Sequence, residues 1–228
     1  MSIEALVFDV FGTVVDWRSS VIAAAVDAGL VGDPGAFADE WRRDGYLRPI
    51  VAAVRGEAQW RPVDELMRTH LDELAPRYGL DGADLDALSG VWRRLDPWPD
   101  AVAGLARLKE RFTIAPLSNG GFAQLTAMAR HAGLPWDCII STDLFRSYKP
   151  DPACYRGAVE LLDLPADRVL LVAAHPADLR AAQACGLRAA YVPRPREWGP
   201  DAAAPEAPDP AFDFVATDFR ELAQLIAA

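Results

Sequence analysis

The sequence predicts a doubly wound α/β fold, in which helices cover both faces of a mainly parallel sheet. Short apolar runs of strand length recur along the chain and alternate with segments whose apolar residues follow a helical period. One stretch, residues 16–95, interrupts this alternation because it holds helical patterns and no clear strand. At 228 residues, of which 51% are hydrophobic, the chain is long enough to bury such a core. We therefore expect a parallel-sheet core with an inserted all-helical cap.

The strand candidates of the core alternate with helical patterns. The first, residues 5–10, is mainly apolar and is closed by Gly12, as expected of a strand buried on both faces. Further strand candidates lie at residues 112–117, 138–141, 169–174, 189–192 and 212–216. The helical patterns between them lie at residues 101–111, 122–132, 152–162 and 177–185, and a last one ends at residue 228.

The cap follows the first strand. Its helical candidates are residues 19–28, 34–54, 62–78 and 81–94. We accordingly divide the chain into a core of residues 1–15 and 96–228 and a cap of residues 16–95. Five of the seven tryptophans lie in the cap or at its junctions and predict an aromatic cap core. An apolar helical cap is also compatible with a homodimer.

Composition excludes several classes of function. The net charge of −10 argues against a nucleic-acid surface, because phosphate backbones are held by clustered lysine and arginine. The N-terminal residues lack the pattern of a signal peptide, and no apolar run approaches about 18 residues, so we expect a cytoplasmic protein without a membrane segment. The three cysteines have no metal-site spacing, and we interpret them as small core hydrophobes. A small anionic substrate stays compatible with this composition.

Asp9 is the first candidate for chemistry, because ligands of open α/β sheets gather at the carboxyl ends of the strands. Taken alone, an aspartate there can equally be a cap for the turn at Gly12 and Thr13. Its neighbours favour a functional interpretation. The run Asp9-Val10-Phe11-Gly12-Thr13 resembles the first motif of the haloacid dehalogenase superfamily, whose first aspartate is the nucleophile.

Three later segments, residues 117–120, 148–155 and 172–178, resemble the remaining motifs of that superfamily in the correct order. The resemblance implies that Ser118 and Asn119 bind the anionic group of the substrate and that Lys149 stands beside the nucleophile. A lysine there keeps the carboxylate ionised and offsets the charge of an anionic substrate. By the same resemblance, Asp178 positions or activates the hydrolytic water.

Phe11 is the informative departure from the superfamily's phosphatases, which carry a second aspartate at that position. A leaving halide is a weak base and needs no proton, whereas a leaving alkoxide generally needs one. Phe11 therefore favours cleavage of a carbon–halogen bond, as in the type II 2-haloacid dehalogenases. Because Ala174 also stands where the phosphatases have an acid, we expect no metal and no cofactor.

The resemblance assigns further residues around the nucleophile. Thr13 is expected to orient it, and Tyr155, the last residue of the third motif, joins the substrate-binding set. In the cap, Arg42 follows Trp41 and resembles the arginine that reaches the departing halide, and we choose it over Arg43. His175 departs from the asparagine of well-studied type II enzymes, so either a plain structural role or a direct catalytic or substrate contact fits.

The expected reaction is displacement of halide from a small L-2-haloacid by Asp9, followed by hydrolysis of the aspartyl ester to a 2-hydroxy acid. Two alternatives stay open. One is a phosphatase of the same superfamily that acts on a small phosphomonoester. The other is a binding protein that kept the fold and lost turnover, an alternative that Ala173 and His175 suggest.

Overall fold

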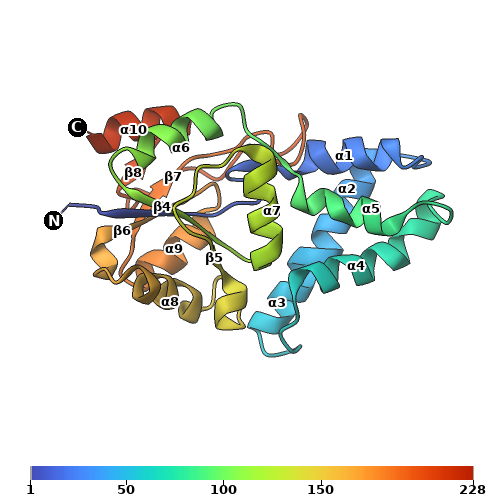
Figure 1. The fold of residues 1–228 in the computed structure, drawn as a ribbon, viewed down its shortest axis with the longest axis horizontal. Coiled ribbons are helices and arrows are strands. Elements are labelled where there is room, and N and C mark those ends of the chain that lie inside the picture. The colour runs from blue at the N-terminus through green and yellow to red at the C-terminus, as the bar shows by residue number, and fades with distance from the viewer. Residues whose placement is uncertain (1, 228) are drawn as a thin grey trace.

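The computed structural model describes residues 2–227 and contains a six-stranded parallel sheet (Figure 1). The strand order is β5-β4-β1-β6-β7-β8, so β1 lies in the interior between β4 and β6. All six predicted strands are present, which confirms the expected fold class. Their bounds are β1 (Ala5–Phe8), β4 (Thr113–Ser118), β5 (Ile140–Ser141), β6 (Val169–Ala173), β7 (Arg188–Tyr191) and β8 (Phe214–Val215).

The sheet is covered on both faces because successive residues of its strands point in opposite directions. Leu6 and Phe8 belong to one apolar cluster, while Val7 belongs to the other. The first cluster packs under α6 (Ala101–Lys109), α7 (Phe122–Ala132) and α10 (Phe219–Ala227). The second packs under α8 (Pro152–Leu162) and α9 (Pro176–Ala184), and Figure 1 shows α6 and α10 on the side of the sheet opposite to α8 and α9. A short helical turn, η4 (Thr142–Phe145), follows β5, and another, η5 (Ala166–Arg168), precedes β6.

The strand register gathers the ends of three strands at one edge. Phe8 pairs with Pro116 of β4 and with Val172 of β6, so the residue after Phe8 lies level with the last residues of both neighbours. All four residues of β1 are fully buried. A polar side chain that follows β1 is therefore held by a rigid strand that is covered on both faces.

The region inserted between β1 and β4 is helical, as predicted. It extends away from the sheet at one end of the molecule (Figure 1). Trp17, Trp41 and Trp92 are fully buried in it, which confirms the expected aromatic core. Its elements are α1 (Trp17–Asp27), α2 (Pro34–Arg42), η1 (Arg43–Leu47), α3 (Arg48–Val54), α4 (Val63–Leu74), η2 (Ala75–Tyr78), α5 (Leu85–Ser89) and η3 (Gly90–Arg93).

One predicted helix, residues 34–54, is not uniform. Between α2 and α3 the chain forms one wide π-helical turn, η1, in which the N–H of Arg48 donates to the carbonyl of Arg43. Pro49 explains the change, because a proline has no N–H to donate to the residue four positions earlier. A wide turn just before the proline accommodates this loss without breaking the helix axis.

Two strands escaped the sequence analysis. β2 (Val15–Asp16) and β3 (Asp96–Pro97) form an antiparallel ribbon where the chain leaves the core and returns to it. Each strand has two residues, too few to show the alternation from which strands are predicted. The ribbon pairs the two segments that link the core to the cap, so both links lie side by side.

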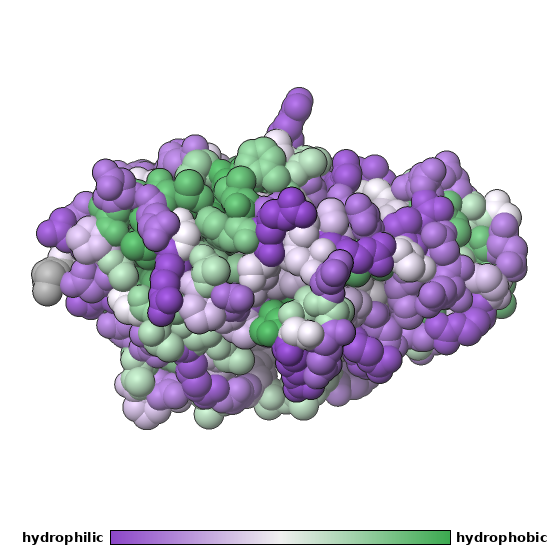
Figure 2. All heavy atoms as spheres, turned by 90° about the horizontal axis from the view of Figure 1, so that it is seen from below, coloured by the Kyte–Doolittle hydropathy of each residue, from purple (hydrophilic) through white to green (hydrophobic). Residues whose placement is uncertain are grey.

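The surface corrects one expectation about the cysteines. Cys154 is buried as predicted, but Cys138 is exposed, so its interpretation as a core residue was wrong. On the face that Figure 2 shows, hydrophilic residues cover most of the helical region, while hydrophobic residues gather over the core. Within residues 2–227 no helix has the length and apolar character needed to cross a membrane.

Candidate active site

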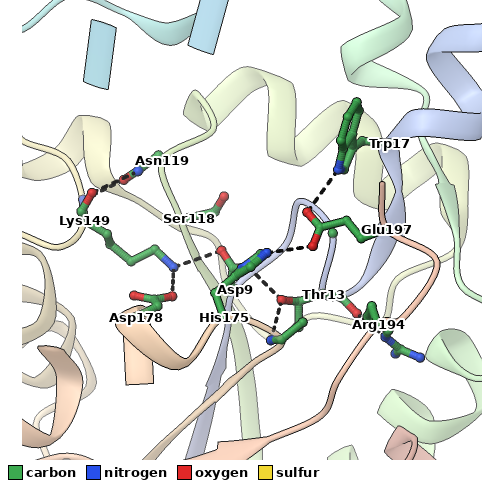
Figure 3. Close-up of polar contacts among 12 residues, drawn as sticks. Asp9, Thr13, Trp17, Ser118, Asn119, Lys149, His175, Asp178, Arg194 and Glu197 are labelled. Atoms are coloured by element: carbon green, nitrogen blue, oxygen red, sulfur yellow. Dashed lines mark hydrogen bonds and ion pairs between the residues drawn. The ribbon is translucent and has the colours of Figure 1, made fainter. Parts of the chain in front are cut away.

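Asp9 directly follows β1 and keeps only 8% of its surface exposed. Three side chains contact its carboxylate (Figure 3). Thr13 donates to Oδ2 over 2.7 Å, Lys149 Nζ lies 3.0 Å from Oδ1, and His175 Nδ1 lies 3.0 Å from Oδ2. Burial raises the pKa of Asp9, but the positive Lys149 and the contact with His175 outweigh burial, so this pKa lies well below its ordinary value. Asp9 is therefore an ionised carboxylate at neutral pH.

The backbone orients the hydroxyl group of Thr13. Its oxygen accepts the N–H of Ala174 over 2.9 Å, which leaves its own proton for Asp9. Arg194 Nε donates to the carbonyl of Thr13 over 2.9 Å, and its guanidinium binds both oxygens of Asp100, at 2.7 and 2.9 Å. This geometry fits the predicted orienting role of Thr13. No local pattern points to Arg194 and Asp100, because their contacts join segments far apart in the chain.

Lys149 links the two carboxylates of the site. Its ammonium group lies 3.0 Å from Asp9 and 2.6 Å from Asp178. Asn119 holds the backbone of Lys149: the amide oxygen accepts its N–H over 2.7 Å, and the amide nitrogen donates to its carbonyl over 3.3 Å. Burial lowers the pKa of Lys149, but Asp178 and Asp9 raise it above its ordinary value. Lys149 therefore stays charged, as predicted from the third motif.

Asp178 lies in the first turn of α9, and Tyr155 supports it from α8. The Tyr155 hydroxyl donates to Asp178 Oδ1 over 2.5 Å, and Tyr155 is fully buried. Burial and the adjacent carboxylate raise the pKa of Tyr155 well above its ordinary value, so the phenol keeps its proton. Asp178 lines the cavity described below, whereas Tyr155 does not. The structure thus places Tyr155 behind Asp178 and not against a substrate, which differs from our expectation.

The two residues of the second motif differ in position. Asn119 lines the cavity, with 8% of its surface exposed. Ser118, the last residue of β4, is fully buried, and its hydroxyl oxygen accepts the N–H of Gly120 over 3.2 Å. In this structure Asn119 can reach a substrate, while Ser118 shapes the turn beneath it.

His175 bridges Asp9 and Glu197, a residue that sequence analysis did not single out. Its Nδ1 faces Asp9, and its Nε2 lies 2.9 Å from Glu197 Oε2. Burial lowers the pKa of His175, but Glu197 and Asp9 raise it more strongly, to about 10. Of the two roles left open for His175, the structure favours one in the site. Glu197 could have been suspected only because it follows β7, whose carboxyl end opens at the same edge of the sheet.

Arg42 ends α2 and reaches the site from the cap. It is 4% exposed, and its guanidinium carbon lies 3.8 Å from the centre of the Tyr46 ring and 5.1 Å from that of Phe11. Its Nε and Nη1 atoms find no hydrogen-bond partner within residues 2–227. Arg43 is exposed. The structure therefore favours the choice of Arg42, which presents buried, unused donors.

A cavity of about 460 Å³ lies between the core and the cap. Asp9 and Arg42 both line it, so the nucleophile candidate and the arginine of the cap border one common space. Part of its wall is apolar, because residues 47–54 of η1 and α3 contribute leucine, isoleucine and valine. The remaining polar residues on its wall are Asn119, Lys149, His175, Asp178, Arg55 and Glu197.

The donor set at Asp9 does not fit a magnesium ion. A hard cation prefers several free oxygen ligands. Both oxygens of Asp9 already contact cationic or hydroxyl groups, and both oxygens of Asp178 contact Lys149 or Tyr155. Lys149 supplies a positive charge at this place. Phe11, whose side chain adds no oxygen ligand, also lines the cavity.

The site and fold agree with known proteins. Residues 3–186 match the family model of the haloacid dehalogenase-like hydrolases, and the chain belongs to that family. This confirms the resemblance that the motifs indicated. Within the family, the (S)-2-haloacid dehalogenase of Xanthobacter autotrophicus is 32% identical over 198 residues, which are 84% of this chain and 76% of that relative.

Two solved structures are similar over nearly the whole chain. The defluorinating L-2-haloacid dehalogenase Rha0230 matches with a TM-score of 0.93 and 42% identity, covering 99% of this chain and 96% of that one. The L-2-haloacid dehalogenase from Xanthobacter autotrophicus with chloropropionic acid covalently bound matches with a TM-score of 0.82 and 27% identity, covering 99% of both chains. These relatives are 2-haloacid dehalogenases, the class of enzyme that Phe11 favours.

Gly12 has no side chain and so leaves room for the carboxylate of Glu197, which predicts that a larger residue at this position lowers stability. Its φ is +84°, and a Cβ atom there would lie 2.1 Å from Glu197 Oε1. Gly29 has a similar φ of +86° but open space around it. We expect Gly29→Ala to lower the free energy of unfolding by about 1 kcal/mol through backbone strain. Gly12→Ala should cost about 1–3 kcal/mol more, because Glu197 must also leave its partners.

Urea unfolding of both variants measures this difference. Equal losses in Gly12→Ala and Gly29→Ala would show that the contact between Gly12 and Glu197 does not constrain the site.

Proposed function

We propose that this chain is an (S)-2-haloacid dehalogenase that converts small L-2-haloacids to 2-hydroxy acids through a covalent ester on Asp9. The observation that carries the proposal is an ionised, buried carboxylate that shares a cavity with Arg42, whose Nε and Nη1 atoms have no hydrogen-bond partner within residues 2–227. Such a pair provides a nucleophile and a halide acceptor. The (S)-2-haloacid and L-2-haloacid dehalogenases among the relatives support it.

In the first half-reaction, an oxygen of Asp9 attacks C2 of the substrate in line with the carbon–halogen bond, with inversion at that carbon. The bond to the halogen breaks with its electron pair, and halide leaves toward Arg42. Aromatic rings around Arg42 exclude water, which strengthens its attraction for the developing charge. Phe11 in this wall stands where the phosphatases carry an aspartate that protonates the leaving group. A leaving halide needs no such proton. Asn119 and Lys149 attract the substrate's carboxylate.

In the second half-reaction, water attacks the carbonyl carbon of the aspartyl ester and releases the 2-hydroxy acid. Asp178 lines the cavity, and its Oδ2 lies 2.6 Å from Lys149 Nζ, which also contacts Asp9; this supports a role for Asp178 at the ester. We assign it the role of positioning and activating this water. Tyr155 then acts through Asp178, which it holds by a hydrogen bond.

The phosphatase alternative is disfavoured by the same residues. Phe11 cannot protonate a leaving alkoxide, and the oxygens of Asp9 and Asp178 are engaged with Lys149, Thr13, His175 and Tyr155. We propose that the reaction needs no metal. The structure gives no support to a binding protein without turnover, because Asp9 keeps its contacts with Thr13, Lys149 and His175. A homodimer, a cytoplasmic location and the division at residues 15/16 and 95/96 stay predictions.

The decisive experiment is halide release from L-2-chloropropionate in the presence of excess EDTA, with the D-enantiomer and fluoroacetate in parallel. We expect release from the L-enantiomer that EDTA does not change. A single turnover in water labelled with oxygen-18 should place the label in Asp9, because water attacks the ester carbonyl and not C2 of the substrate. Magnesium-dependent phosphate release from phosphomonoesters, with no halide release, would overturn the proposal. Fluoride release would extend the halide range to that named for Rha0230.

A further inference from the structure

Two donors converge on one oxygen of Asp9. The Thr13 hydroxyl lies 2.7 Å from Oδ2, and His175 Nδ1 lies 3.0 Å from the same atom. Lys149 is the partner of the other oxygen, Oδ1. An oxygen that accepts two hydrogen bonds is a poorer nucleophile than one that accepts a single bond, so Oδ1 is the better attacking atom. Oδ2 then becomes the carbonyl oxygen of the ester.

Carboxyl groups that face both ring nitrogens favour a charged His175. A carboxylate only accepts hydrogen bonds, so Nε2, which faces Glu197, must carry a proton. Nδ1 faces Oδ2 of ionised Asp9 at 3.0 Å and must carry a proton for the same reason. With both nitrogens protonated the ring is an imidazolium, and it donates to Oδ2 as a cation.

Glu197 is built into the site and not an incidental surface residue. Only 7% of it is exposed, although it is a glutamate in a loop. Trp17 Nε1 donates to Oε1 over 3.2 Å while His175 binds Oε2, so both carboxylate oxygens have partners (Figure 3). The loop is anchored three residues earlier by Arg194, which binds the Thr13 carbonyl and Asp100. The fold thus fixes the carboxylate behind His175.

We propose that Glu197 is a positioning residue for ester hydrolysis: it holds His175 as a charged donor, so that His175 and Thr13 together form the oxyanion hole of the aspartyl ester. This inference rests on the proposed dehalogenase function and deepens its second half-reaction. The two distances to Oδ2, 2.7 and 3.0 Å, lie in the range of effective oxyanion donors. Glu197 itself acts only through His175.

Hydrolysis of the ester proceeds through a tetrahedral intermediate at Cγ of Asp9. The water oxygen bonds to Cγ of Asp9, one water proton passes to Asp178, and the carbonyl electron pair moves to Oδ2, where Thr13 and His175 hold it. The pair then returns, the bond from Cγ to Oδ1 breaks, and Oδ1 leaves as the hydroxyl oxygen of the product with a proton from Lys149. Asp9 keeps the water oxygen as a carboxyl group, whose proton returns to Lys149, and Asp178 releases its proton to solvent.

The test compares the two half-reactions in Glu197→Gln by rapid-quench measurement of halide release from L-2-chloropropionate. Halide displacement needs no oxyanion hole, so the variant should still release about one equivalent of halide per site in a fast phase. Steady-state turnover should fall about 10- to 100-fold, because losing an oxyanion donor outright costs about 10²–10³-fold. Mass spectrometry of the quenched protein should then find the propionate ester accumulated on Asp9.

Matched variants separate this role from a structural one. Glu206→Gln makes the same change in an exposed ion pair with Arg180 and should leave both phases unchanged. In a His175→Asn background, Glu197→Gln should cause no further loss, because asparagine is a neutral donor that needs no carboxylate behind it. Glu197→Asp, which keeps the charge, should restore part of the steady-state rate.

The outcomes are distinct. Equal loss of the fast phase and of steady-state turnover in Glu197→Gln, without accumulated ester, would overturn the inference. If that variant does not fold, Trp17→Phe, which removes the other hydrogen bond of Glu197, is measured in the same way with the same expected accumulation. A wild-type protein that shows neither halide release nor ester would instead refute the dehalogenase function itself.

Discussion

Replacing Asp9 with asparagine is expected to lower halide release from L-2-chloropropionate by about 10⁴-fold or more, because an amide oxygen is a far weaker nucleophile than a carboxylate. The wild-type carboxylate is kept ionised at the cavity by Lys149 and by its contact with His175. The measurement is steady-state halide release, with tryptophan fluorescence to verify the fold.

Asp16→Asn is the matched control for this variant. Asp16 belongs to the same segment, but it caps α1 by accepting the N–H of Ser19 over 3.0 Å. Asparagine caps helices about as well as aspartate, so this variant should keep its stability and its activity. Comparable halide release by Asp9→Asn and the wild type would show that water displaces the halide directly.

The second large effect is expected at Arg42. Arg42→Lys should lower kcat by about 10²-fold, because an ammonium group lacks the planar face that stacks on Tyr46 and the fork of donors that meets a halide. Stacking places the guanidinium carbon 3.8 Å from the Tyr46 ring centre, and Nε and Nη1 are unused by residues 2–227. KM should change less than kcat, since halide charge develops only as the bond breaks.

Arg43→Lys provides the comparison, because Arg43 is the next residue in the chain and points into solvent. We expect its kcat and KM to match those of the wild type. A larger loss in Arg43→Lys than in Arg42→Lys would mean that the cap rotates in solution and presents the other arginine. Steady-state kinetics with chloropropionate and bromopropionate suffice to distinguish these results.

Local sequence patterns were enough to predict the strands of the core and the main residues of the site. Short apolar runs that end in turns predict parallel strands from local patterns alone, and all six strands are present. Because the carboxyl ends of parallel strands share one edge, the order of the motifs was enough to bring together Asp9, Asn119, Lys149 and Asp178. Phe11 and Ala174 indicated a dehalogenase, because they lack the carboxyl groups that a phosphatase carries at these two positions.

The contacts that support these residues join segments far apart in the chain and could not be predicted from local patterns. Glu197 lies 22 residues after His175 in the chain, yet its carboxylate is 2.9 Å from that ring. No periodicity or spacing encodes such a contact, which depends on how the loop after β7 folds over the sheet edge. The placement of Tyr155 behind Asp178, and of Arg42 instead of Arg43 in the cavity, follows from side-chain directions in packed helices. A sequence pattern specifies which residues share an element, whereas burial and distance between elements arise only when the whole chain packs.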